Sequence, residues 1–358
     1  MTRTRTTLLL AVILLLAGLH AFRASLAIRI AERGIERSLA AEPFAALSDG
    51  ITLVLCGAGG PLPDPRRSGP CVAVQAGKLH LVIDAGSGGA RNLTRMRFPV
   101  GDIDALLLTH FHSDHIDGIG ELAMLSWVNA ANTAPLPVLG PPGTSAVVDG
   151  FNTAYAADAR FRHAHHGDAV APMSGRGMQA SEFPVPPPKE SVVVLQREGV
   201  TVRMFAVNHA PVDPAVGYRI EYAGRAVVVS GDTARSASLE AVARGTDLLV
   251  HEALSPEMVA AMHRAAVAAN RPIVAKVTAD IPGYHSSPED AAKSATAAGA
   301  RHLLLYHIVP PLLVPGMDAA FLKGVPEAFA GPVTLGVDGS LFSLPAGSDA
   351  VRELPNAL

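Results

Sequence analysis

Short runs of apolar residues, separated by turns rich in glycine and proline, recur between positions 50 and 345 of the chain. Runs of about four to eight apolar residues bounded by such turns are typical of buried strands. Other segments carry apolar residues at helical spacing, as at Ile116, Ile119, Ala123 and Trp127. The pattern therefore predicts an α/β fold. The predicted strands are Ile51 to Leu55, Cys71 to Gln75, Leu79 to Ile83, Ile103 to Leu108, Ser191 to Leu195, Val200 to Val207, Val216 to Tyr222, Ala226 to Ser230, Leu248 to Val250 and Leu303 to Tyr306.

The most chemically dense stretch, Thr109 to His115, directly follows one of these strands. Its four side chains able to bind a transition metal are His110, His112, Asp114 and His115. Because a helix follows, the cluster lies on a strand-to-helix turn, the place where ligands bind in open α/β sheets. Imidazoles together with a carboxylate suit Zn²⁺, with Mn²⁺ and Fe²⁺ as alternatives. We interpret the cluster as a metal site rather than as a polar surface turn.

The second half of the chain repeats this arrangement, with polar residues again placed after predicted strands. These residues are His209, Asp232, the adjacent His251 and Glu252, and His307. His285 instead precedes a predicted helix, which Ser287 caps and Pro288 begins. A lone histidine after a strand is more often structural, but several in one chain favour a shared site. Two halves packed sheet to sheet, with helices outside, would bring these side chains to one edge.

Two further features lie early in the domain. Asp84 ends the strand Leu79 to Ile83 before a glycine-rich turn, and it is a candidate to orient a metal-bound histidine. Cys56 closes one predicted strand and Cys71 opens the next. The two thiols either pair in an oxidising compartment or remain two small buried apolar residues, and both interpretations stay open.

The N-terminus departs from the pattern of the rest of the chain. Arg3 and Arg5 precede an apolar stretch from Leu8 to Leu19 that continues weakly to Phe22. This is typical of a secretory signal or a short membrane anchor, although a spanning helix needs roughly 20 apolar residues. A buried N-terminal helix is the alternative. We expect an exported protein, periplasmic or otherwise extracytoplasmic. Its expected parts are a signal or inner-membrane anchor with a connecting helix at 1–40, one domain at 50–345 with an insertion at 144–190 near the site, and a tail at 346–358.

Composition and charge narrow the expected partners. The chain has 358 residues, of which 49% are apolar, enough to form one large core. Its 29 Lys and Arg residues are nearly balanced by 32 Asp and Glu residues, which gives a formal net charge of −3. No broad basic surface for nucleic acid is implied, and we therefore expect no nucleic-acid partner.

Taken together, the motifs resemble the metallo-β-lactamase superfamily over Gly50 to Pro345, which implies a four-layer αββα sandwich and a metal-dependent hydrolase. The finer pattern is similar to the RNase Z-like branch. It consists of His209 in Asn-His-Ala-Pro, Asp232 in Ser-Gly-Asp-Thr, His251 and Glu252 in Val-His-Glu-Ala, and the run from Tyr284 to Ala292. Within that branch, Gly140 to Thr144 favours a resemblance to the exported arylsulfatase-like group.

The resemblance also implies a role for each site residue. One metal ion is held by His110, His112 and His209, a second by Asp114, His115 and His307, and Asp232 bridges the two. Two divalent ions about 3.5 to 4 Å apart, most readily Zn²⁺, would lower the pKa of a shared water to about 7 and supply hydroxide. Asp114 would orient or deprotonate that water. His251, or alternatively His285, would protonate the leaving oxygen.

The expected activity is hydrolysis of a small anionic ester, either an aryl sulfate or a phosphodiester. The alternatives are carbonyl hydrolysis as in lactonases and β-lactamases, an RNase Z-type endoribonuclease, and a noncatalytic metal-binding protein. Against the endoribonuclease stand the expected export, the net charge, and the lack of a basic glycine-rich arm in Pro135 to Glu190 that would grip tRNA. Further expected partners are a membrane, if the N-terminal segment is retained, and a second copy of the chain in a homodimer.

Overall fold

The computed structural model describes the chain from residue 2 to residue 358, and for most residues before Phe22 it describes the backbone alone. The chain divides into two units, Met1–Ala46 and Leu47–Leu358. The first unit contains helix α1 (Thr2–Leu39). Among the described residues, no helix combines the length and apolarity needed to cross a membrane. Most side chains of the predicted signal or anchor, Leu8 to Phe22, lie outside the described part, so export stays a prediction.

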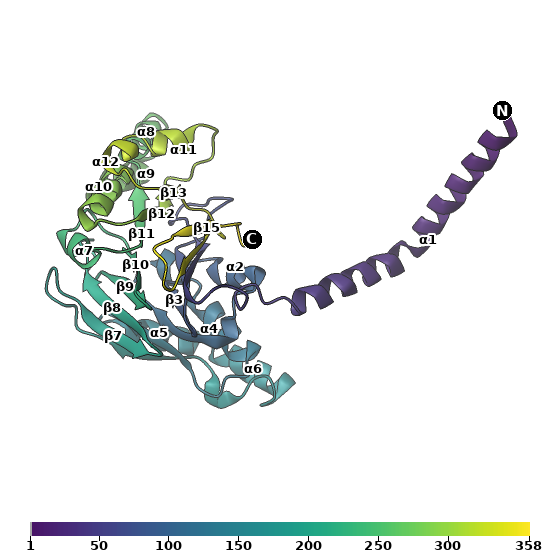
Figure 1. Ribbon diagram of the computed structural model, residues 1–358, viewed down its shortest axis with the longest axis horizontal. Helices are drawn as coiled ribbons and strands as arrows, with labels where there is room; N and C mark the ends of the chain where they lie inside the picture. Colours follow the sequence, from purple (N-terminus) through teal and green to yellow (C-terminus); the bar gives the residue numbers. More distant parts are fainter. Residues whose placement is uncertain (1) are drawn as a thin grey trace. The chain divides into compact units, whose positions relative to one another are not determined.

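The second unit contains two β-sheets (Figure 1). The first sheet has the strand order β15 (Arg352–Leu354), β14 (Leu341–Pro345), β1 (Gly50–Gly57), β2 (Cys71–Ala76), β3 (Leu79–Ile83), β4 (Ile103–Leu107), β5 (Leu136–Gly140) and β6 (Met178–Glu182). The second has the order β13 (Val333–Leu335), β12 (His302–Val309), β11 (Leu248–Leu254), β10 (Arg225–Val229), β9 (Val216–Tyr222), β8 (Val200–Ala206) and β7 (Val192–Arg197). Each predicted strand therefore exists, with ends that differ by at most a few residues, except that β11 and β12 run further than expected.

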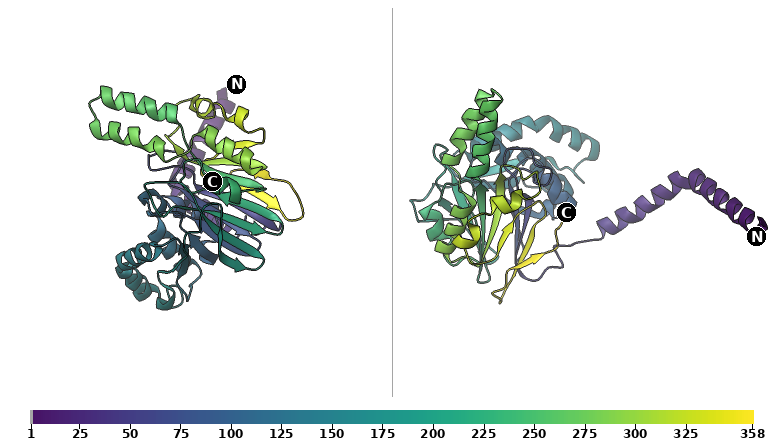
Figure 2. Two further views of the ribbon diagram at one scale, coloured as in Figure 1. Left: turned by 90° about the vertical axis from the view of Figure 1, so that its left-hand side faces the viewer. Right: turned by 90° about the horizontal axis from the view of Figure 1, so that it is seen from above.

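Helices pack on both sheets (Figures 1 and 2). On the first sheet lie α2 (Gly89–Met96), α4 (Ile119–Asn129) and α5 (Thr144–Ala154), and on the second lie α7 (Ala237–Val242) and α10 (Pro288–Ala298). The remaining helices are α3 (Ser113–Ile116), α6 (Ala156–His166), α8 (Pro256–Ala268), α9 (Pro272–Asp280), α11 (Met317–Phe321) and α12 (Val325–Ala328). Ser287 caps α10 by accepting a hydrogen bond from the Asp290 N–H, as predicted. Two sheets packed with helices are the architecture that the sequence indicated.

A large apolar core lies between the sheets, and a second lies between the β7–β13 sheet and its helices. Strand β11 contributes to both cores, because successive side chains of a strand point to opposite faces. Leu248 and Val250 belong to the core between the sheets, whereas Leu249 and Ala253 pack with the helices. This alternation decides where the polar residues of β11 lie.

Two segments take part in the sheets although the sequence suggested otherwise. The expected tail at 346–358 contains β15, which pairs antiparallel with β14. The expected insertion at 144–190 contains α5, α6 and β6, and β6 pairs in parallel with β5 at the edge of the sheet. Both segments are therefore integral to the fold rather than appended to it.

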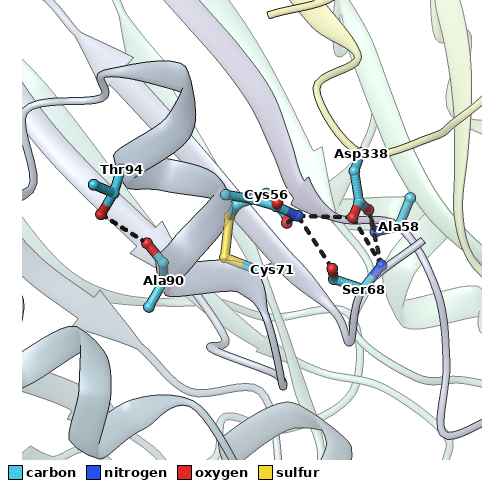
Figure 3. The surroundings of a disulfide bond; sticks show 8 residues. Cys56, Ala58, Ser68, Cys71, Ala90, Thr94 and Asp338 are labelled. Carbon is cyan, nitrogen blue, oxygen red and sulfur yellow. Dashed lines mark hydrogen bonds between the residues drawn. A yellow bond between two sulfur atoms is a disulfide. The ribbon is translucent and has the colours of Figure 1, made fainter. Parts of the chain in front are cut away.

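A disulfide between Cys56 and Cys71 joins the facing ends of β1 and β2 (Figure 3). It closes the loop between these strands, and the structure thus selects the paired form of the two cysteines. Asp338 also holds this loop, because its carboxylate accepts hydrogen bonds from the backbone N–H groups of Ala58 and Ser68 at about 3.0 Å. The loop is therefore fixed at both of its ends.

Candidate metal centre

The stretch from Thr109 to His115 lies between the end of β4 and the first turn of α3, as the sequence predicted. His110 and His115 are fully buried, while His112 and Asp114 are partly exposed. Two ligand candidates thus lie deep at the sheet edge and two lie nearer its surface. This arrangement can enclose an ion and leave one side of it open.

The first group of ligand atoms comes from His110, His112, His209 and Asp232, all within 4.8 Å of one another; we call it the His110 site. The closest approaches are His110 Nε2 to His112 Nδ1 at 3.1 Å and His209 Nε2 to His112 Nδ1 at 3.5 Å. The other nitrogen of His209, Nδ1, donates to the Tyr284 carbonyl at 2.9 Å. Burial lowers the pKa of His110 well below its usual value and that of His209 below its usual value, which favours the neutral imidazole that binds metal.

The second group, which we call the Asp114 site, consists of Asp114, His115 and His307, again within 4.8 Å of one another. His307 Nε2 lies 3.3 Å from the Asp114 carboxylate. Asp232 touches both groups, since its Oδ2 lies 3.3 Å from His115 Nε2, 3.3 Å from His307 Nε2 and 3.8 Å from His110 Nε2. The structure therefore brings together all seven predicted ligands and puts Asp232 where a bridging ligand would lie.

The donor set and its burial fit divalent cations. His115 Nε2 and Asp232 Oδ1 are buried without a hydrogen-bond partner among the described residues. Leaving such an atom unpaired costs about 1 to 3 kcal/mol, which a bound cation would offset. Burial raises the pKa of Asp232, but the neighbouring His307 and His115 outweigh this and hold it well below its usual range, so the carboxylate is the charged form that binds metal. Two bound divalent ions would polarise the oxygens of an anionic ester and lower the pKa of water.

Asp84 orients the ligands of both sites from behind, as predicted for one of them. Its carboxylate accepts from His115 Nδ1 at 2.7 Å, from the Thr109 hydroxyl at 2.7 Å and from the Thr109 N–H at 2.9 Å. The same hydroxyl lies 3.1 Å from His110 Nδ1. Because a carboxylate only accepts, these bonds place protons on the Nδ1 atoms and leave both Nε2 atoms to a metal.

Glu252 and His285 form a charged pair beside the metal ligands. One Glu252 oxygen accepts from His285 Nδ1 at 3.1 Å, from the Ser286 N–H at 3.0 Å and from the Thr233 N–H at 3.1 Å. The His285 ring stacks on His307 with centroids 5.6 Å apart. Burial lowers the pKa of His285, but the charge and hydrogen bond of Glu252 outweigh it and raise the pKa to about 9.

His251 lies elsewhere, which argues against its expected role as proton donor. It follows Leu249 in the alternation of β11 and is wholly buried on the side of the helices, and it belongs to none of the metal-binding groups found among the described residues. Its neighbour Glu252, on the side of Val250, reaches the site instead. Strand alternation counted from Val250 could have separated the two residues, and the anchoring role of Glu252 was missed.

The chain is similar to proteins of known family and to solved structures. Residues 80–308 match the family model described as "Beta-lactamase superfamily domain". A ribonuclease Z of Mycobacterium bovis (strain BCG / Pasteur 1173P2) is 36% identical over 290 residues, which cover 80% of this chain and 96% of that protein. The human short form of tRNase Z has a TM-score of 0.57 at 19% identity and covers 82% of this chain and 99% of that one. The metallo-β-lactamase fold protein YhfI of Bacillus subtilis has the same TM-score, identity and coverage.

These relatives overturn the expectation that no nucleic acid is involved. That expectation rested on the net charge and the N-terminus, whereas the proteins that match over most of their length are named as ribonucleases. The aryl sulfate substrate finds no support among them. The family match and the extended similarity to ribonuclease Z show that this chain belongs to the metallo-β-lactamase superfamily of metal-dependent hydrolases, in its RNase Z-like branch.

Proposed function

We propose that this protein is an RNase Z-type endoribonuclease, a phosphodiesterase that uses two divalent metal ions, most readily Zn²⁺. The observation that carries the proposal is the similarity to ribonuclease Z along 96% of that enzyme. The family match at residues 80–308 includes the ligand-bearing stretches of both sites. His110, His112 and His209 would hold one ion, Asp114, His115 and His307 the other, and Asp232 both. RNA is therefore the substrate class that we would test first.

Asp114 is the more exposed of the two carboxylate ligands, and we propose that it acts on the attacking water. Its side chain is 15% exposed, whereas those of His115 and Asp232 are buried. A cavity of about 480 Å³ adjoins it, lined in part by Pro61, Ser87 and Asp117. Substrate entering this cavity would meet Asp114 first, which supports its role in orienting the water.

His285 is the proposed proton donor to the leaving oxygen, in place of His251. Glu252 fixes its Nδ1, which leaves Nε2 as the nitrogen available to a substrate atom. RNA cleavage expels a ribose alkoxide, which is far more basic than a phenolate and therefore needs a proton. Donation from His285 would move that proton to the departing oxygen, and Glu252 would stabilise the ring meanwhile.

The test is a substrate panel with enzyme reconstituted with Zn²⁺ or Mn²⁺. It contains a tRNA precursor with a 3′ extension, bis-nitrophenyl phosphate, nitrophenyl sulfate, a lactone and a β-lactam. We expect endonucleolytic cleavage of the precursor, abolished by Asp232→Ala and by chelation. Turnover of the sulfate or of a carbonyl substrate without cleavage of RNA would refute the proposal.

A second candidate is hydrolysis of small aryl esters by an exported enzyme, which would not meet precursor tRNA. The Cys56–Cys71 disulfide bears on the export rather than on the ester. Disulfides persist mainly in oxidising compartments, so the bond supports an extracytoplasmic location for the catalytic domain. For this second candidate we propose an extracytoplasmic location, which the apolar N-terminal segment supports as well. N-terminal sequencing of the protein from membrane and soluble fractions tests it, and recovery of the intact chain with reduced cysteines from the cytosol would exclude it.

A further inference from the structure

His251, the buried histidine that does not reach the metal centre, makes one hydrogen bond that bears on it. Its Nδ1 lies 2.7 Å from the backbone carbonyl of Glu252. The carbonyl can only accept, so the ring carries its proton on Nδ1. The other nitrogen, Nε2, is buried without a hydrogen-bond partner among the described residues. The hydrogen bond of this buried ring is therefore made to the main chain of Glu252.

Glu252 lies at an irregularity in the pairing of β11 with the neighbouring strand β12. Glu252 lies opposite Tyr306, but the next residue, Ala253, lies opposite Ile308, so that His307 is one extra residue in the parallel ladder. Such a bulge locally disrupts the ladder and turns side chains to new directions. The carbonyl that His251 holds is therefore at the point where the pairing slips.

This bulge is what turns His307 toward the metal centre. Leu304 and Tyr306 face the core between the sheets, whereas Leu303 and Leu305 pack with the helices. A regular strand would put His307 with Leu303 and Leu305, away from the site. Instead its φ is +47°, a left-handed conformation that is costly for a residue with a Cβ. Such a conformation persists only where the surroundings hold it in place.

The bulge is held from the other side by the loop that the disulfide closes. The Ile308 N–H donates to the Ala58 carbonyl at 3.0 Å, while Ile308 itself lies opposite Ala253 of β11. Gly60 lies against the His307 ring, because a Cβ added to it would be 3.0 Å from His307 Cε1. The bulge is therefore supported on the side of β1, and the Glu252–Ala253 peptide that His251 bonds lies opposite it in β11.

We infer that His251 is a positioning residue, which fixes the Glu252 main chain and thereby holds both the His307 bulge and the Glu252 carboxylate that orients His285. His251 acts through Glu252 and touches no ligand of the metals. The inference rests on the metal centre of the proposed function but not on its substrate.

The test compares His251→Leu, which removes the donor, with His251→Asn, whose side-chain N–H can take the place of Nδ1–H. The readout is binding of Zn²⁺ and Co²⁺ to the full chain by chelator competition, together with the visible spectrum of the Co²⁺ form. His302→Leu is the matched control, since His302 is likewise a buried histidine, in the neighbouring strand β12, and bonds the Thr334 hydroxyl at 2.9 Å.

We expect His251→Leu to lower the metal affinity of the Asp114 site about 10- to 100-fold, as is typical of residues that orient metal ligands. The visible spectrum of the Co²⁺ form should change as well. His251→Asn should recover most of the affinity, and His302→Leu should bind both ions as the wild type does. The inference would be overturned if His251→Leu bound both ions as the wild type does. It would also be overturned if His251→Asn and His302→Leu lost as much metal affinity as His251→Leu. Because no substrate is used, failure to cleave RNA would leave this result unaffected.

Discussion

Replacing Asp84 with asparagine should weaken the binding of both metal ions, because this one carboxylate orients ligands of both sites. Asp84 is buried and accepts three hydrogen bonds, from His115 Nδ1, the Thr109 hydroxyl and the Thr109 N–H. An amide accepts through its oxygen only, and its NH₂ group would face at least one of these donors. In Asp84→Asn either the Thr109 main chain or the His115 ring is left with an unpaired, buried N–H.

The size of the effect follows from what the two donors do. Removing a group that orients a metal-bound histidine typically costs about 10- to 100-fold in affinity, or about 1.4 to 2.7 kcal/mol. At the Asp114 site the contact to His115 is direct, so the loss should reach the upper end of this range. At the His110 site the contact passes through the Thr109 hydroxyl, so the loss should be near the lower end.

Two further variants make the measurement specific. Thr109→Val removes only the hydroxyl and should weaken the His110 site alone. Asp117→Asn is the control, since Asp117 is exposed, carries the same charge, and its carboxylate accepts from the Ser87 hydroxyl at 3.3 Å. Stepwise affinities are measured by chelator competition and isothermal titration. If Asp84→Asn bound both ions as Asp117→Asn does, the assignment of Asp84 would be refuted.

The other predictions concern the charged pair and the disulfide. His285→Ala should slow RNA cleavage by about 100-fold but a nitrophenyl phosphodiester by less than about tenfold, since a phenol leaves without an acid; equal loss in steady-state rates would exclude proton donation. In the metal-free protein the pKa of His285 is raised to about 9, mainly by Glu252 against the effect of burial. The pair should therefore stabilise the fold by on the order of 3 kcal/mol below pH 6.5 and lose this as the pH rises through 9, and urea unfolding of His285→Ala should lack this slope. Replacing Cys56 and Cys71 with alanine should lower the free energy of unfolding by about 3 kcal/mol, whereas thiol titration of the native wild type should find no free thiol.

Most of the metal centre could be predicted from the sequence because its chemistry is concentrated at strand ends. His110, His112, Asp114 and His115 are adjacent in the chain, so one strand-to-helix turn delivers them together. The distant ligands could be placed because parallel strands of one sheet end at the same edge. The order of the strands was not needed for that conclusion. Local pattern and sheet geometry thus indicated a shared site, and the family resemblance implied which residues form the ligand set.

The supporting residues were harder, because their placement depends on a break in regularity. Alternation counted from Val250 puts Glu252 toward the site and His251 toward the helices, and this can be read from the sequence alone. The same rule fails for His307, since the bulge in β12 reverses its side. A bulge has no strong signature in a single sequence, and His307 was assigned through family resemblance. Only the structure shows that a bulge turns the His307 side chain toward the site.

The expectation about nucleic acid failed for a different reason, since a net charge of −3 describes the whole chain and not the surface near the site. Acidic ligands such as Asp114 and Asp232 count as negative in that sum, although their function would be to hold cations. Two divalent ions there would be the largest local charges and would reverse the sign of the field that a phosphate meets. For a metal-dependent hydrolase, formal charge computed without the metals therefore underestimates affinity for polyanions.

We expect RNA binding by this chain to depend on metal loading, and filter binding of a tRNA precursor to metal-free and Zn²⁺-loaded protein at one salt concentration should differ by more than about tenfold. Equal binding by the two forms would show that residues outside the metal centre hold the RNA.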